Sequence, residues 1–202
     1  MFKRLIVIVC ILSVSISTAV MVLSTAPVIS LIQHGADAYD YDVLLTRDVV
    51  SYVTNWQLAV PTPRMTSLLT EAEQDHLTDV RTVYRLVRYI FLFSIAGAVA
   101  CLLYPRARRA LRRWSVNVRR LVTWTIIGMS TLLGVAFVAF DAVFTFMHQL
   151  LFADGTWQFE GTSRLLAIVP ERFWFLWGMT LVILTISFLW CLQRFIPRQN
   201  RS

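Results

Sequence analysis

Four windows of this 202-residue chain are long, apolar and almost free of charge, and they constrain its fold more than any other feature. A helix needs roughly 20 apolar residues to cross about 30 Å of hydrocarbon. The windows predict transmembrane helices over residues 5–28, 84–104, 121–150 and 172–194. Hydrophobic residues make up 57% of the chain and charged residues 15%, which excludes an ordinary soluble domain. We therefore predict a single all-α membrane domain over residues 1–202 with four transmembrane helices.

The first window has a rival interpretation as a cleaved signal peptide. Residues 2–4 resemble the basic start of such a peptide, and residues 24–26 resemble its cleavage site. However, Pro27 follows that site directly, and the apolar run exceeds the roughly 7 to 15 residues of a signal peptide's hydrophobic region. We expect the segment to remain as a transmembrane helix.

The distribution of basic residues predicts the orientation. The amino terminus, the loop 105–120 and the carboxyl terminus would share one side, and together they hold 12 of the 19 Lys and Arg residues and none of the 12 Asp and Glu residues. An excess of Lys and Arg in short loops marks the cytoplasmic face. We expect a multi-pass protein of the cell membrane with both termini in the cytoplasm. The same rule accounts for the net charge of +7, so we expect no nucleic-acid partner.

Residues 32–80 and the loop 152–171 would then form a small extracytoplasmic cap. The stretch around Tyr52 and Trp56 mixes aromatic and apolar residues, as interfacial helices do, but its β-branched residues favour a strand. Whether the cap contains short β-strands is therefore left open. Thr70 and Glu73 form a capping box, which predicts a helix that continues from the cap into the second span.

Two groups of polar residues stand out at the predicted outer end of the bundle. His76 and Asp79 are three residues apart, and Asp141, Thr145 and His148 follow at spacings of four and three, so each group lies on one helix face. Ionisable residues at or below a membrane interface are costly, which makes them candidates for function. The topology places both groups at the same depth, on the extracytoplasmic side. We predict that they form one site.

The residue types leave several chemistries open. The chain has no Gly-x-Ser-x-Gly elbow, no Gly-rich phosphate loop and no His-Glu-x-x-His pair, which argues against a serine hydrolase or a nucleotide enzyme. Two His and a carboxylate could bind a metal, or the two His could transfer protons as base and acid. A third possibility is a non-catalytic membrane protein that binds lipid or assists an envelope complex.

Three strings add a resemblance to a known family. EAEQDHLTDVRTVY, FDAVFTFMHQLLFADGTWQF and LLAIVPERFWF, in this order, resemble the Gram-positive integral membrane family that includes the lipoprotein intramolecular transacylase. That resemblance implies an acyltransferase that moves the sn-2 acyl chain of a diacylglyceryl lipoprotein to the amino group of its N-terminal cysteine, which gives the lyso-form. It implies catalytic roles for His76 and His148, which stand in DHLTDV and FMHQLLF.

The same interpretation assigns partners and supporting residues. The partners would be the lipoprotein substrate and membrane lipid, with no cofactor, no metal and a monomeric chain. One aspartate would orient a histidine, and aromatic residues would shape a dry pocket. The supporting residues are Asp79, Asp141, Thr145, Trp56, Trp157 and Tyr52. The chain departs from the family pattern at Thr162-Ser163-Arg164, where we expect an acidic residue before LLAIVPE.

Overall fold

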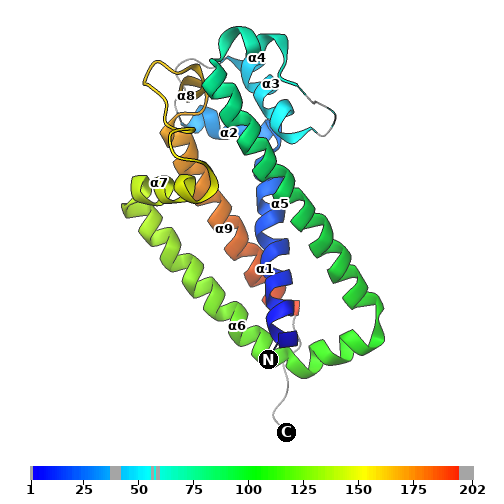
Figure 1. Ribbon diagram of the computed structural model, residues 1–202. Coiled ribbons are helices and arrows are strands. Elements are labelled where there is room, and N and C mark those ends of the chain that lie inside the picture. The colour runs from blue at the N-terminus through cyan, green and yellow to red at the C-terminus, as the bar shows by residue number, and fades with distance from the viewer. Residues whose placement is uncertain (1, 37–41, 56, 58–59, 196–202) are drawn as a thin grey trace.

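The computed structural model describes residues 2–36, 42–55, 57 and 60–195, whose regular structure is entirely helical. The helices, in chain order, are α1 (Phe2–Leu23), α2 (Ala26–Gly35), α3 (Val43–Thr54), α4 (Pro63–Leu68), α5 (Glu71–Leu103), α6 (Pro105–Val138), α7 (Phe140–Leu151), α8 (Arg164–Ile168) and α9 (Glu171–Phe195). The all-α prediction is confirmed for this part of the chain. The start of α1, the junction of α5 with α6 and the end of α9 lie at one end of the bundle, and the short helices lie at the other (Figure 1).

Three helices of the described chain are long and apolar enough to cross a membrane. The segments are Glu71–Ala100 of α5, Asn117–Val138 of α6 and Glu171–Arg194 of α9. A fourth candidate span consists of Ile11–Leu23 of α1 and Ala26–Gly35 of α2 taken together, and these two segments are bent by 74° relative to each other. Pro27 explains the bend, because a proline inside a helix clashes with the carbonyl four residues earlier, which here belongs to Leu23. The helix expected over 5–28 therefore ends at Leu23.

The third predicted span is also divided. We expected one helix over 121–150, but α6 ends at Val138 and α7 begins at Phe140, with Ala139 in a non-helical conformation (φ −130°, ψ 51°). Figure 1 shows α7 lying across the end of α6 instead of continuing it. The expected loop 105–120 is the first part of α6, which Pro105 opens at a position where proline is well tolerated.

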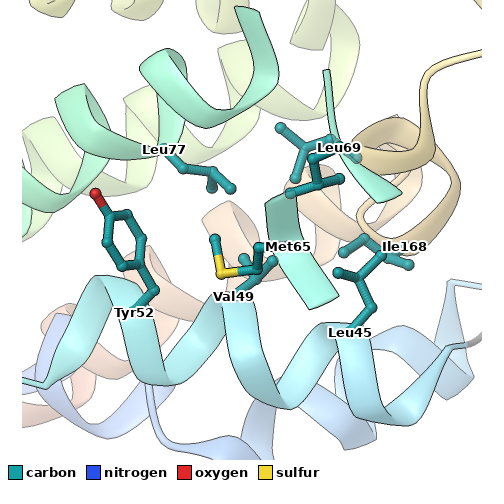
Figure 2. Packing of buried hydrophobic residues seen from close by; sticks show 8 residues of the cluster. Leu45, Val49, Tyr52, Met65, Leu69, Leu77 and Ile168 are labelled. Carbon is teal, nitrogen blue, oxygen red and sulfur yellow. The ribbon is translucent and has the colours of Figure 1, made fainter. Parts of the chain in front are cut away.

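A helical cap, made of α3, α4, α8 and the first turns of α5, closes one end of the bundle. Its core is a cluster of buried side chains seen in Figure 2, namely Leu45, Val49, Tyr52, Met65, Leu69, Leu77, Leu165 and Ile168. Three of them recur along α3 at intervals of four and three, which is the spacing of one helix face. The Asp42 carboxylate starts α3 by accepting hydrogen bonds from the amides of Leu44 and Leu45, at 3.0 and 2.9 Å. The β-strand alternative for this stretch was wrong.

Candidate active site

His76 lies in the second turn of α5, and the capping box fixes the start of that helix. The Thr70 hydroxyl accepts a hydrogen bond from the Glu73 amide at 3.3 Å, and the Glu73 carboxylate accepts one from the Thr70 amide at 2.7 Å. The predicted capping box is therefore confirmed. A long helix that begins at a defined residue holds its second turn in a defined place, so His76 has little freedom of position. Its side chain is buried, with 7% of its surface exposed.

His148 lies near the end of α7, and its ring is oriented by its own helix. Nδ1 is 2.9 Å from the carbonyl oxygen of Phe144, one turn earlier. A carbonyl can only accept, so Nδ1 carries the hydrogen and the neutral ring presents its Nε2 lone pair on the other side. Burial lowers the pKa of His148 below its ordinary value of 6.5, and the bond to Phe144 opposes this in part. The ring is therefore neutral near pH 7 and able to accept a proton.

The structure brings the two histidines face to face. Their ring centroids are 6.2 Å apart and their planes are inclined by 25°. Phe152 borders both rings, with its centroid 4.9 Å from that of His76 and 5.4 Å from that of His148. Phe159 and Trp157 close the sides, at 5.5 Å from His76 and 4.8 Å from His148. Two imidazoles thus share an apolar, aromatic enclosure in which polar interactions are strengthened.

Two atoms of these side chains have no hydrogen-bond partner among the residues that the structure describes. They are His76 Nδ1 and Trp157 Nε1, and both are buried. Buried polar groups are nearly always paired in folded proteins, because an unpaired one costs about 1–3 kcal/mol. Unpaired buried atoms on His76 and on the tryptophan beside His148 make this a candidate place for a polar guest.

Glu73 supports the site, and the sequence predicted only part of its role. Beyond its capping bonds, its carboxylate accepts hydrogen bonds from the Ser163 hydroxyl and, at 3.0 Å, from the Leu165 amide. The same Ser163 hydroxyl accepts a bond from the Leu166 amide at 3.2 Å and so caps α8. The Thr-x-x-Glu spacing predicts the local cap, but it contains no sign of the partners about 90 residues away. Glu73 thus joins the start of α5 to the loop that carries Trp157.

The acidic residues expected to orient a histidine lie elsewhere. The Asp141 side chain is hydrogen-bonded to that of Glu171, at the start of α9, and the orienting group of His148 is a backbone carbonyl. Asp79 is exposed, and its charge acts on His76 from the same helix without a hydrogen bond to the buried Nδ1. Thr145 is half-buried on α7.

The two remaining predicted residues have different outcomes. Tyr52 lies in the core of the cap, where its hydroxyl is 2.9 Å from that of Thr78 and its ring packs 4.7 Å below the Arg81 guanidinium carbon. It holds α3 against α5 and has no contact with either histidine ring among the described contacts. Trp56 lies outside the described residues.

The described residues contain no group of three or more His, Cys, Asp or Glu side chains that could hold a metal ion. The two histidines have aromatic rings around them where a metal site would need carboxylates or thiolates. The arrangement suits proton transfer between a base and a polar guest in a dry enclosure.

Comparison with known proteins gives a structural likeness and a family match. No curated protein matches the chain. Among solved structures it is similar to the membrane integral lipoprotein intramolecular transacylase Lit from Bacillus cereus, with a TM-score of 0.67, 18% identity and 94% of each chain covered. Two variants of that enzyme, in which one histidine is replaced by arginine or by alanine, match with TM-scores of 0.56 and 16% identity; 94% of this chain and 90% and 92% of theirs are covered. At this identity the likeness shows a shared fold.

The family model is more decisive than the structural likeness. The model of the lipoprotein intramolecular transacylase Lit matches residues 2–174, which include both histidines and the loop between α7 and α8. The match spans most of the chain, and the strings that carried the resemblance lie within it or continue directly from it. This chain belongs to the lipoprotein intramolecular transacylase family.

Proposed function

We propose that this chain moves the sn-2 acyl chain of a diacylglyceryl lipoprotein onto the amino group of the lipoprotein's N-terminal cysteine, which leaves a lyso-form lipoprotein. Membership of a transacylase family supports the class of reaction. The observation that carries the site assignment is the pair of buried imidazoles, 6.2 Å apart, inside an aromatic enclosure. The nucleophile and the ester belong to one substrate, so no acyl-enzyme and no cofactor are needed.

His148 acts as the general base. The α-amino group of the substrate has a pKa of about 7.7 to 8.0, so near pH 7 it first releases one proton to solvent. The neutral amine then attacks the ester and must lose a second proton as it does so. The hydrogen bond from Nδ1 to Phe144 leaves Nε2 as the proton acceptor. As nitrogen bonds to the ester carbon and the carbon–oxygen bond to glycerol breaks, the same Nε2 returns its proton to the glyceryl oxygen. The reaction is balanced without another reagent.

His76 acts as a hydrogen-bond donor to the ester. Its Nδ1 is buried and has no partner within the described chain, so it is available to a substrate oxygen. In this role the ring stays neutral throughout the reaction. It polarises the carbonyl and stabilises the negative charge that develops on it, where pre-positioned donors contribute most to rate.

The aromatic enclosure favours the amine over water as the nucleophile. Phe144, Phe152, Phe159 and Trp157 present ring carbon to the histidines, and a substrate that fills the space between them leaves little room for water. Holding the amine and ester together in this space contributes to the rate, by roughly 7–11 kcal/mol in the best cases. The expected product is therefore an amide, not a free fatty acid.

The surface of α7 supports a site at the membrane surface. The helix face opposite His148 carries Phe146 and Leu150, whose side chains are 66% and 72% exposed. It continues the exposed apolar surface of α6 at Phe137 and Val138. Exposed apolar surface of this extent is stable in contact with lipid. With the basic residues placed in the cytoplasm, the site would open at the outer leaflet, where the lipoprotein's acyl chains are anchored.

The test is conversion of lipoprotein in a Gram-positive host that lacks any such transacylase. Mass spectrometry of the lipoprotein amino terminus should show an N-acylated lyso-form when the chain is expressed. His76→Ala and His148→Ala should each lower the conversion rate by about 10²- to 10⁴-fold. The matched control is His34→Ala, because exposed His34 makes the same kind of bond to a carbonyl one turn earlier, 2.7 Å from Ser30 O.

Three outcomes would count against the proposal. An unchanged diacyl form with the wild-type chain would reject the transacylase function and would favour a non-catalytic lipid-binding protein. Full conversion by both alanine variants would reject the assignment of the two histidines as the active site, but not the transacylase function. Loss of conversion on treatment with a chelator would reject the cofactor-free mechanism.

A further inference from the structure

Trp157 has a fixed position beside His148. It follows a turn that Gly155 makes possible with a φ of +81°, a conformation that favours glycine. Within the turn, the amide and hydroxyl of Thr156 donate to the carbonyl of Ala153, at 3.3 and 2.9 Å. The far end of the loop is held by the bond between Ser163 and Glu73. A loop held at both ends presents the Trp157 ring 4.8 Å from His148, inclined by 37°.

The indole nitrogen of Trp157 is a donor without an acceptor. An indole N–H can only donate, and here it is buried with no partner. Four buried side-chain atoms of the described chain are in this condition. The two outside the site, Gln33 Oε1 and Arg81 Nε, belong to side chains that make a hydrogen bond through another atom. Trp157 and His76 have no such compensation within the described structure. Buried tryptophan normally finds a partner for its N–H, so this N–H is available to an acceptor from outside the described residues.

We infer that Trp157 is a catalytic residue whose indole N–H donates to the carbonyl oxygen of the sn-2 ester. The inference rests on the proposed function and deepens it. When the amine nitrogen bonds to the ester carbon, the carbonyl electron pair moves onto oxygen, and Trp157 Nε1–H and His76 Nδ1–H hold this oxyanion together. When the carbon–oxygen bond to glycerol breaks, the pair returns to form the amide carbonyl, and the proton held by His148 goes to the glyceryl oxygen.

The position of the ring favours the ester carbonyl as the acceptor. The base must reach the attacking amine while the oxyanion donors reach the oxygen on the same carbon, so donor and base must border one small space. The rings of Trp157 and His148 are adjacent, with centroids 4.8 Å apart, and the ring of Phe152 lies beside His76. A packing role would require only the ring of Trp157, and the N–H would then be dispensable.

The experiment tests whether activity needs the N–H of Trp157 or only its ring. Trp157 is replaced by 3-benzothienylalanine, in which sulfur occupies the place of the N–H, and in parallel by Trp157→Phe. The control is Trp177→Phe, because Trp177 packs against the α2 and α9 cluster and contacts neither histidine. The full chain in phospholipid vesicles is assayed with a synthetic diacylglyceryl lipopeptide, and kcat, KM and the melting temperature are measured.

The isostere should lower kcat by about 10²- to 10³-fold, as loss of one oxyanion donor does, with KM and the melting temperature nearly unchanged. It should weaken the binding of a phosphonate analogue of the tetrahedral intermediate by a similar factor. A kcat within twofold of the wild type would overturn the inference, even if Trp157→Phe were slow, because the ring alone would then suffice. Since the wild-type chain must convert the lipopeptide for this comparison, failure of the proposed function is recognised separately.

Discussion

The two histidines are held in different ways. His76 is on a long helix whose start is tied to the cap by the buried Glu73 carboxylate, which is 1% exposed and accepts bonds from Thr70, Ser163 and Leu165. His148 is on a twelve-residue helix whose outer face is apolar and exposed. One side of the site is thus fixed by hydrogen bonds inside the protein. The other is held by aromatic packing around His148 and presents an apolar, exposed outer face.

The largest expected effect comes from breaking the α5 side. Glu73→Ala should lower the free energy of unfolding by about 3 kcal/mol, because it leaves several buried donors without an acceptor. Thermal unfolding in detergent would measure this. Glu71→Ala is the control, since Glu71 is exposed in the same first turn and should cost less than about 1 kcal/mol. Equal effects of the two variants would show that the network does not stabilise the site.

The effect of a substitution on the outer face of α7 should depend on the bilayer. Leu150→Gln removes apolar surface from the outer face of α7. It should make the contact of α7 with the bilayer less favourable by about 2 kcal/mol. We expect lower transacylation in vesicles and less quenching by brominated lipid of a fluorophore on that face. Leu150→Met should behave like the wild type because it stays apolar. Unchanged quenching in the Gln variant would contradict the contact with lipid.

The titration of His148 sharpens the comparison further. Its pKa is lowered, first by burial, so the folded protein binds the proton less well than free histidine with its pKa of 6.5. The substrate amine, with its pKa of about 7.7 to 8.0, makes kcat/KM fall tenfold per unit below that pH, and protonation of His148 should add a further tenfold per unit once the pH drops below its lowered pKa. The pH profile of kcat/KM measures this acid limb. A second limb that begins above pH 6.5 would contradict His148 as a buried, neutral base.

The smallest effect should come from the cap. Tyr52→Phe removes the bond to the Thr78 hydroxyl but keeps the ring beneath Arg81, and should cost about 1 kcal/mol of stability. The value of kcat should not change, since Tyr52 packs in the cap core and not against a histidine. Chemical denaturation and the lipopeptide assay together measure this. A large loss of kcat with unchanged stability would indicate instead that Tyr52 acts in the active site.

Much of the fold followed from local patterns, and the errors have local causes. The capping box predicted the start of α5, and apolar length predicted helices suited to a membrane. The breaks at Leu23 and Ala139 were missed because the apolar runs continue across both of them. Pro27 was the available signal for the first break. In α3, the burial of one face outweighed the strand preference of its β-branched residues.

The sequence by itself determined the helical class and the presence of long apolar helices, and it singled out His76 and His148 as candidates, because each depends on the residue types along one helix. Only the tertiary structure decided which groups meet those histidines. It set Phe152 and Phe159 against His76, joined Glu73 to Ser163 across 90 residues, and left the buried Trp157 N–H without a partner among the described residues. Such contacts depend on how separate helices pack, and the spacing within any one helix carries no record of that.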